Sequence, residues 1–471
     1  MTRSAHSVAQ VRAAEEPLLA AGFPLMARAA TGLAVAVSRR LPFVYGARVA
    51  LLVGSGNNGA DALWAGAWLA RRGAAVVAVL AADPVQDALQ GFLLAGGRLG
   101  TPEALVGADV TVDGLVGIGG RGALRPAAAA LVEQVEGFTV AVDVPSGVDA
   151  DTGAVAGVAV RADLTVTFGC LKPGLLIARD HVGQIQLVPL PYVLGPAPVE
   201  ALTDDDARGL VPRAERASDK YSRGVLGVAA GSQTYTGAAV LSVGGALRAG
   251  AGMVRFAGAP QVAAQVRARW PEAVVTEAHG AGVAEVGRVQ AWVVGPGLGI
   301  DADETVEAVL AQDVPVVVDA DALTLCAQRP LWLRDRTAPT LLTPHDREFA
   351  RFGFEVGTDR IGAARRLAQE LGVHVLLKGD ATVVVGPEGP ARVNTTGSAV
   401  LATAGAGDVL AGGIGALLAQ GLDVLDAASL AAYLHGRAGL LSADGAATSA
   451  SLLLEAWPAA VRELGARHSN P

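Results

Sequence analysis

Short runs of aliphatic residues recur along this chain, and most end in glycine, asparagine or aspartate where a helical stretch begins. One unit runs from the strand-like RVALLVG (48–54) through SGNNGAD to the helical ALWAGAWLARRG and a second strand, AVVAVLAAD. Strand, glycine turn, helix and strand make a βαβ unit, which requires a parallel sheet covered by helices. The pattern therefore predicts an α/β fold.

The same alternation restarts in the second half, where GVLGVAAGS (224–232) and AWVVGPGLG (291–299) are strands that run into glycine turns. A chain of 471 residues is too long for one ordinary core. Residues 195–222 mix charge, proline and glycine without helical or strand periodicity. We therefore predict two doubly wound domains, residues 1–212 and 213–471, with the boundary near Arg213.

Charge and cysteine usage exclude several classes of function. The net charge of −8 argues against nucleic acid or an anionic membrane surface as the main partner. Cys170 and Cys326 are the only cysteines, too few for a disulfide scaffold or a cysteine metal site, and they suit a reducing cytoplasm. The N-terminus lacks the apolar core of a signal peptide, and no uncharged apolar run reaches membrane-spanning length. We expect a cytoplasmic protein.

The stretch NTTGSAVLATAGAGDVLAGGIGA (394–416) brings one carboxylate, Asp408, to the start of an apolar helix expected from Val409 to about Gln420. The small residues before Asp408 let backbone N–H groups approach a ligand, and the helix N-terminus favours phosphate oxygens. An aspartate there is placed to take a proton from a hydroxyl group during phosphoryl transfer. Taken alone, Asp408 could instead cap the helix.

Three expected strand ends in the first half carry polar residues: Asn57 and Asn58, then Asp113, then Asp143 with Ser146. Because ligands of open α/β sheets bind outside the carboxyl ends of strands, we expect these side chains to share one crevice. Carboxylates that face one pocket repel each other, which predicts a bound cation. Taken alone, the asparagine turn could be a dinucleotide fingerprint of the G-x-G-x-x-G type or a simple Asx-rich helix cap.

Several blocks together resemble the bifunctional NAD(P)H-hydrate repair enzyme family. In the first half these are GNNGAD, DGLVGIG and DVPSGVDADTG; in the second they are GPGLG, TPHDREFAR, KGDAT and TAGAGD, in the family's order. The resemblance implies a Rossmann-like, three-layer NAD(P)HX epimerase domain fused to a ribokinase-like, ADP-dependent (S)-NAD(P)HX dehydratase domain. It also implies the substrates NADHX and NADPHX, the co-substrate ADP, and the ions Mg²⁺ and K⁺, and it leaves a homo-oligomer open.

The resemblance also implies a role for individual residues. Asp143 and Asp408 would be catalytic, and K⁺ would be held by Asn58, Asp113 and Ser146. The hydrated nicotinamide nucleotide would be bound in the first domain by Asn57, Asn58, Gly59, Ala60, Asp61, Gly117, Ile118, Gly119, Gly120, Arg121, Gly122, Ala123 and Asp143. In the second domain it would face Ala238, Gly299, His345 and Asp408. The adenine nucleotide would be held by Lys378, Gly379, Asp380, Ala381, Thr382 and Gly407.

The chain departs from the family pattern at Ala60 and Ala62, where glycines are usual, and at MARAAT (26–31), which replaces M-E-N-A-G. These departures keep open an N-terminal domain that senses or binds a nucleotide without catalysis. A further alternative is a ribokinase-type kinase that phosphorylates a small alcohol, with an accessory, non-catalytic N-terminal domain. That kinase would prefer ATP and release a stable phosphorylated product.

Overall fold

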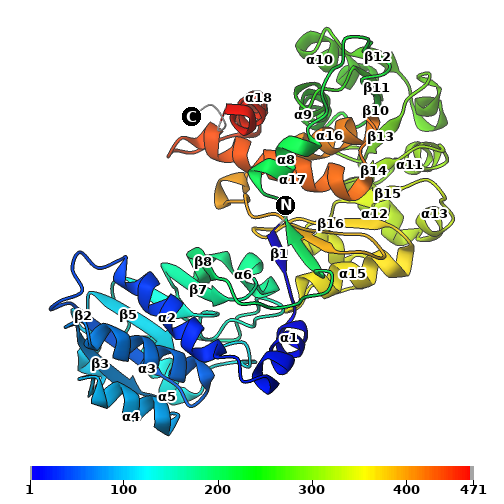
Figure 1. The fold of residues 1–471 in the computed structure, drawn as a ribbon. Helices are drawn as coiled ribbons and strands as arrows, with labels where there is room; N and C mark the ends of the chain where they lie inside the picture. Colours follow the sequence, from blue (N-terminus) through cyan, green and yellow to red (C-terminus); the bar gives the residue numbers. More distant parts are fainter. Residues whose placement is uncertain (1–2, 467–471) are drawn as a thin grey trace. The chain divides into compact units, whose positions relative to one another are not determined.

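The structure is a computed structural model that describes residues 3–466. Its packing forms two compact units: Ser4–Val199 form the N-terminal unit, and Arg3 belongs with residues 200–466 to the C-terminal unit (Figure 1). The N-terminal unit holds a seven-stranded sheet in the order β4-β3-β2-β5-β6-β7-β8, with every neighbouring pair parallel. The predicted α/β class is therefore confirmed for this unit.

The N-terminal strands are β2 (Arg48–Val53), β3 (Ala75–Leu80), β4 (Arg98–Leu99), β5 (Val110–Gly114), β6 (Thr139–Val142), β7 (Leu164–Phe168) and β8 (Gln184–Val188). The helices are α1 (Val8–Ala20), α2 (Leu25–Ser38), α3 (Asn57–Ala70), α4 (Gln86–Leu94), η1 (Pro102–Leu105), α5 (Pro126–Val132), α6 (Pro173–Ile177) and α7 (Arg179–Val182).

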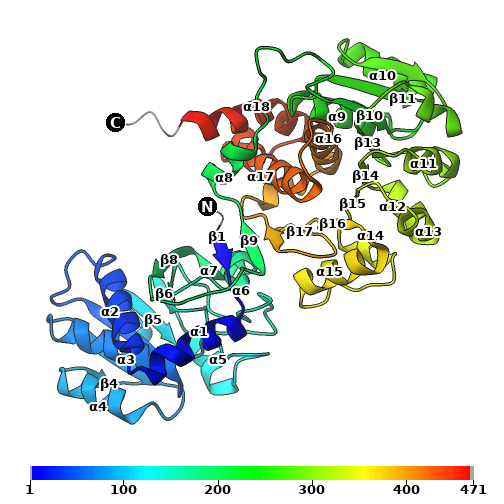
Figure 2. The ribbon, with the colours of Figure 1, turned by 45° about the vertical axis from the view of Figure 1, so that its right-hand side comes forward.

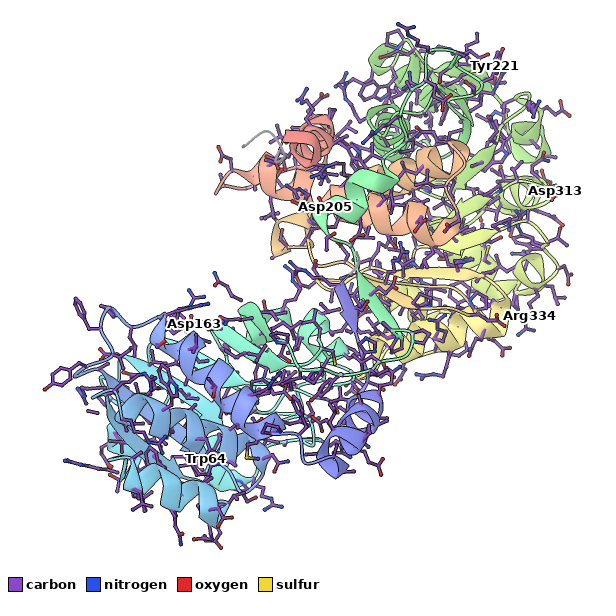
Figure 3. The ribbon with its side chains drawn as sticks, in the orientation of Figure 1. Trp64, Asp163, Asp205, Tyr221, Asp313 and Arg334 are labelled. Atoms are coloured by element: carbon purple, nitrogen blue, oxygen red, sulfur yellow. The ribbon has the colours of Figure 1, made fainter. Side chains whose placement is uncertain are left out.

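The N-terminal unit has three layers, because alternate residues of its strands face opposite sides of the sheet. Leu51 of β2 belongs to one hydrophobic cluster with α2, α3 and α4, and Leu52 belongs to another with η1 and α5. Between α3 and α4 the packing is close, since a Cβ atom on Gly91 would lie 2.3 Å from the ring of Trp64. Trp64 is labelled in Figure 3. The helices thus cover both faces of a buried parallel sheet.

The C-terminal unit is built on an 11-stranded sheet in the order β1-β9-β18-β17-β16-β15-β14-β13-β10-β11-β12. Pairing is parallel from β12 to β16, whereas β17 runs antiparallel to both β16 and β18. Its strands are β1 (Arg3–Ala5), β9 (Val199–Ala201), β10 (Val225–Ala229), β11 (Met253–Gly258), β12 (Val274–Glu277), β13 (Ala291–Val294), β14 (Val316–Val318), β15 (Thr340–Leu342), β16 (His374–Leu377), β17 (Val383–Val385) and β18 (Ala391–Val393).

The helices of the C-terminal unit are α8 (Asp204–Leu210), α9 (Thr236–Arg248), α10 (Pro260–Arg269), η2 (Gly280–Glu285), α11 (Asp303–Leu310), α12 (Asp321–Gln328), α13 (Leu331–Arg334), α14 (Asp346–Ala350), α15 (Arg360–Leu371), η3 (Ala399–Leu401), α16 (Ala406–Ala419), α17 (Val424–Ala443) and α18 (Ala450–Ala466). Figure 2 shows α16 and α17 beside the sheet, with α9 and α18 next to them.

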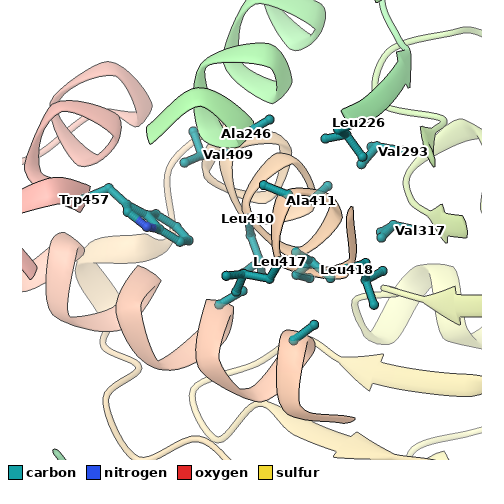
Figure 4. Close-up of a cluster of buried hydrophobic side chains, with 14 of the residues drawn as sticks. Leu226, Ala246, Val293, Val317, Val409, Leu410, Ala411, Leu417, Leu418 and Trp457 are labelled. Carbon is teal, nitrogen blue, oxygen red and sulfur yellow. The ribbon is translucent and has the colours of Figure 1, made fainter. Parts of the chain in front are cut away.

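Helix α16 is the centre of the C-terminal core (Figure 4). Its glycines let neighbours approach closely: a Cβ atom on Gly412 would lie 2.0 Å from the carbonyl oxygen of Ser242 in α9, and one on Gly415 would meet Val293 of β13. The helix starts at Ala406, after Gly405 with φ +85°, so Asp408 lies in its first turn. Close packing on two sides holds that turn in place.

The boundary between the units lies earlier in the chain than the sequence suggested, since residues 200–212 belong to the C-terminal unit. The segment 195–222, expected to be irregular, contains β9 and α8. Thr203 and Asp206 form a capping box that starts α8, and Asp204 pairs with Arg437 of α17 at 2.6 Å. The cap signal was present in the sequence, but the ion pair that joins α8 to α17 is a long-range contact.

Within residues 3–466, no single helix is long and apolar enough to cross a membrane. Helices α1 and α2 meet that test of length and composition only as a pair, bent by 116° at their junction.

Candidate functional sites

A pocket of about 660 Å³ opens in the N-terminal unit at the carboxyl ends of β2, β5 and β6. The strand order reverses between β2 and β5, which is where open α/β sheets bind ligands. Of the residues that the sequence placed there, the pocket is lined by Asn57, Asn58, Asp61, Gly117, Ile118, Gly119, Gly120, Arg121, Gly122, Ala123 and Asp143. Gly59 and Ala60 lie outside its lining.

Gly59 and Ala60 pack behind the residues that line the pocket. A Cβ atom on Gly59 would lie 2.2 Å from the carbonyl oxygen of Gly54, so only glycine fits there. Ala60 and Ala62, the two departures from the family glycines, are fully buried in the core between α3 and the sheet. Their methyl groups therefore do not change the pocket wall. From the altered segment 26–31, Met26 and Ala29 do line the pocket.

Asp143 forms an ion pair with a buried lysine, Lys172, which was not among the predicted site residues. The ammonium group of Lys172 lies 2.5 Å from Asp143 Oδ1, and it also donates to the hydroxyl of Thr167 at 3.0 Å. Lys172 is 1% exposed, so this ion pair is shielded from water. Asp143 also has φ +65°, a left-handed conformation that costs a non-glycine residue energy. The fold thus stores strain to aim this carboxylate into the pocket.

Asp61, which also lines the pocket, has a different environment. Burial, followed by the charges of Asp143 and Glu15, raises the pKa of Asp61 well above its usual range. Its Oδ1 atom is buried and has no hydrogen-bond partner among the described residues. The pocket therefore contains one carboxylate that is paired with a cation and one carboxyl group that favours its protonated form.

Of the three residues expected to hold potassium, Asn58 lines this pocket, whereas Asp113 and Ser146 are fully buried outside its lining. Ser146 donates to Asp113 from its hydroxyl (2.6 Å) and from its backbone N–H (2.8 Å), and burial raises the pKa of Asp113 to about 6. Asn58 donates its amide to the carbonyl of Val142, and its oxygen faces Gly117. The side chains of Asn58, Asp113 and Ser146 all contain oxygen atoms, which are the ligands that a hard monovalent cation prefers. Residues 3–466 contain no cluster of three or more His, Cys, Asp or Glu side chains that suits a metal ion.

The C-terminal unit places Asp408 beside a lysine and a set of acids. Burial, then the charge of Asp319, raises the pKa of Asp408 to about 7, and the ammonium of Lys378 opposes this shift. Lys378 Nζ lies 2.8 Å from Asp319 Oδ1 and 3.7 Å from Glu348 Oε2. Asp319 is buried and accepts a hydrogen bond from Thr343 at 2.8 Å. An aspartate whose pKa is close to 7 can act as a general base at neutral pH.

Lys378 lies next to the glycine loop that precedes α16. A Cβ atom on Gly407 would lie 3.6 Å from Lys378 Nζ, so the ammonium and the N-terminal turn of α16 face one another. His435 of α17 lies behind this turn, with Nε2 2.9 Å from the carbonyl oxygen of Ala406. Burial lowers the pKa of His435 to about 4, so a neutral ring donates this hydrogen bond. No sequence pattern marked His435, which resembles any histidine on an apolar helix.

The other residues expected in this domain lie at a helix start, in a glycine turn and in α9. His345 is the N-cap of α14, and its Nδ1 atom accepts from the backbone of Arg347 and Glu348. Gly299 donates its N–H to Asp321 at 2.9 Å, and Ala238 lies against Gly297 of the same glycine turn.

The KGDAT loop after β16 is held by a hydrogen bond within the loop and by another from α15. The hydroxyl of Thr382 donates to the carbonyl of Gly379 at 2.9 Å, and Arg360 donates to the carbonyl of Lys378 at 2.8 Å. Ala381 is buried beneath the loop, whereas Asp380 is exposed. The loop therefore presents backbone groups next to the ammonium of Lys378.

Comparisons with known proteins agree with this arrangement. A family model described as "NAD(P)H-hydrate dehydratase" matches residues 226–458, and one described as "YjeF-related protein N-terminus" matches residues 22–174. A bifunctional NAD(P)H-hydrate repair enzyme of Mycobacterium leprae is 49% identical over 456 residues, which cover 94% of each chain. The chain belongs to this repair enzyme family. Another member, from Mycobacterium tuberculosis, is 48% identical over 410 residues, 84% of this chain and 85% of the relative.

Solved structures support the family assignment for the C-terminal unit. An ADP/ATP-dependent NAD(P)H-hydrate dehydratase from Bacillus subtilis, co-crystallised with ATP and Mg²⁺, is 30% identical with a TM-score of 0.50, and covers 56% of this chain and 97% of that one. A ribokinase-like superfamily protein from Enterococcus faecalis is 26% identical with a TM-score of 0.52, over 58% of this chain and 98% of the other. The ribokinase-like fold predicted for the C-terminal half of this repair enzyme is confirmed.

Proposed function

We propose that this repair enzyme converts hydrated NADH and NADPH back to NAD(P)H through two activities. The N-terminal unit interconverts the (R) and (S) hydrates, and the C-terminal unit dehydrates the (S) form at the expense of ADP. The observation that carries the second activity is Asp408, whose pKa is raised to about 7 in the first turn of α16 beside Lys378. The repair family favours this function over a kinase that releases a stable phosphorylated alcohol.

In the dehydration step, the hydroxyl oxygen at C6 of the hydrated ring attacks the terminal phosphorus of ADP. Asp408 accepts the hydroxyl proton as the new P–O bond forms and AMP leaves. Phosphate then departs with the electrons of the C6–O bond, and loss of a C5 proton restores the C5–C6 double bond. The backbone N–H groups of Gly405–Gly407 and the ammonium of Lys378 stabilise the charge on the transferred group.

Other residues would bind the nucleotide and orient the substrate. The loop Lys378–Thr382 holds the adenine nucleotide, and Ala238, Gly299 and His345 face the hydrated ring. Mg²⁺ would neutralise charge on the diphosphate. Asp319 and Glu348 keep the ammonium of Lys378 between themselves and α16. Their role is to position a cation where the phosphoryl group arrives.

In the epimerisation step, we assign proton transfer to Asp143, since the buried ion pair with Lys172 fixes its carboxylate in the pocket. The substrate would lie against the Asn57–Asp61 turn and the Gly117–Ala123 loop, both of which contribute residues to the pocket lining. A potassium ion held by the oxygens of Asn58, Asp113 and Ser146 would supply positive charge near that loop. This activity gives the C-terminal unit access to both hydrates.

The decisive experiment is Asp408→Asn, which keeps the size of the side chain and removes the base. NADH formation from the (S) hydrate and ADP, followed by its absorbance, should fall by a factor of about 10² to 10⁴. ADP affinity measured by calorimetry should stay within about twofold, because the loop amides and Lys378 remain. Unchanged turnover would refute the role of Asp408. Accumulation of a stable phosphorylated product in the wild type would instead support the kinase alternative.

A further inference from the structure

The C-terminal unit has a second pocket, of about 280 Å³, at the end of α16 that is remote from Asp408. We name it the arginine pocket; its lining includes Arg213, Arg223, Arg248, Leu417, Trp457 and Val461. It lies among the last turns of α9 and α16, the helices α17 and α18, and the segment that precedes β10. Because α16 has 14 residues, the arginine pocket and Asp408 are separated by roughly 20 Å.

The charge of this pocket is unusual for the molecule. Three arginines and no acidic residue line it, although the chain as a whole carries a net charge of −8. Arg213 is exposed, and within residues 3–466 it has no ion-pair or hydrogen-bond partner. Arg223 uses one N–H on the carbonyl of Gly250, and Arg248 uses one on Glu455 at 2.6 Å. Each guanidinium has five N–H donors. Most N–H groups of these three arginines therefore have no acceptor among the described residues.

Two further donors in the wall are buried without an acceptor. Trp457 is 0% exposed, and its indole Nε1 has no hydrogen-bond partner among the described residues; the same holds for Nε of Arg248. Leaving a buried donor unsatisfied is unfavourable, because the group loses its hydrogen bond to water. Figure 4 shows the Trp457 ring against α16, near the leucines of that helix. The remaining wall is apolar, with Leu417, Leu430 and Val461.

Helix capping explains only some of these arginines and buried donors. The C-terminal ends of α9 and α16 carry partial negative charge, which attracts arginine. However, the last carbonyls of α16 are already satisfied, since Ala416, Leu417 and Leu418 accept from the backbone N–H groups of residues 420–422. Arg223 covers the end of α9 through Gly250. Arg213 and the buried donors of Arg248 and Trp457 have no capping role.

We propose that the arginine pocket binds a small organic anion, a phosphate monoester or carboxylate with an apolar or aromatic body. The anionic oxygens would accept from Arg213, Arg248 and the indole N–H of Trp457. The body would lie against the leucines of α16 and α17. A pocket of about 280 Å³ limits the ligand to about the size of a mononucleotide or smaller. This site is separate from the two proposed catalytic sites and does not depend on their function.

The test is calorimetric titration of the full chain with phenyl phosphate and with benzoate, with ADP and Mg²⁺ present to fill the nucleotide site. The variant Arg213→Glu should weaken binding of the preferred anion at least tenfold, as expected when a charge-assisted hydrogen bond is lost. The matched control is Arg216→Glu, three residues away, exposed and outside the pocket lining. It makes the same change in net charge and should alter the affinity less than twofold.

Two more measurements sharpen the result. Benzyl alcohol, an uncharged analogue, should bind far more weakly than either anion. Trp457→Phe removes the indole N–H and should weaken binding about fivefold, with the unfolding temperature measured to check the fold. Equal affinities of the Arg213→Glu and Arg216→Glu variants would overturn the proposal. So would equal binding of benzyl alcohol, or a wild-type chain that binds neither anion saturably.

Discussion

At the scale of single residues, both sites combine a lysine with carboxyl groups. Lys172 is buried and pairs with Asp143, and the partly buried Lys378 pairs with Asp319 while facing Glu348 and the turn of Asp408. A lysine that is shielded from water carries its charge at a cost in desolvation, which is offset when acids surround it. The chain has only three lysines, and two of them are in these sites. Arginine, with its planar fork, could not replace the compact ammonium at either place.

The pKa of Asp408 predicts the pH dependence of dehydration. As a base, Asp408 must be ionised, so the rate should rise with pH below about 7 and level off above it. Lys378 lowers this pKa, so Lys378→Met should move the midpoint to higher pH, in addition to any loss of rate. The control is Lys220→Met at an exposed position, which should leave the midpoint unchanged. A midpoint for Lys378→Met that stays fixed or falls would contradict this electrostatic role.

At the scale of elements, α16 links the core to the chemistry. It packs on α9 through paired glycines, since a Cβ atom on Gly412 would overlap Ser242 and one on Gly245 would overlap Val409. This close approach fixes the axis of α16 and therefore the direction of its N-terminal turn. His435 adds a hydrogen bond to that turn from α17.

Gly412→Ala should therefore destabilise the C-terminal unit by about 1–3 kcal/mol, because the added methyl group forces α9 and α16 apart. Scanning calorimetry should show a lower transition temperature for this unit. Gly209→Ala is the matched control, since Gly209 lies in α8 with nothing within 4 Å of its added Cβ atom. That change should be neutral or slightly stabilising, as alanine favours helix. A Gly412→Ala variant as stable as the wild type would show that the contact can relax.

At the scale of the whole molecule, each unit has its own sheet, core and pocket. The confirmed predictions are the α/β class, the ribokinase-like C-terminal fold and the family. The assignment of site residues, the potassium ion, a cytoplasmic location and a homo-oligomer stay predictions. The division of packing at Val199 and Glu200 shows that the linker region in the sequence is partly built into the C-terminal core.

Two separate sites predict activities that can be removed one at a time. Asp143→Asn should abolish epimerisation and leave the dehydration of purified (S) hydrate within about twofold of wild type. Asp408→Asn should do the reverse. Chiral separation of the two hydrates measures the first activity, and NADH absorbance measures the second. If either change removed both activities, the two-site assignment would be wrong.

The sequence by itself determined the alternation of strands and helices, the two sheets and the order of the glycine-rich blocks. These features depend on local periodicity and on turns that only small residues allow, so they can be recognised along the chain. The tertiary structure alone decided which cations meet which acids: Lys172 reaches Asp143 across 29 positions, and Lys378 reaches Asp319 across 59. It also put His435 behind the Asp408 turn and left Ala60 in the core. Such contacts depend on how strands and helices pack in space, and no local pattern encodes that distance.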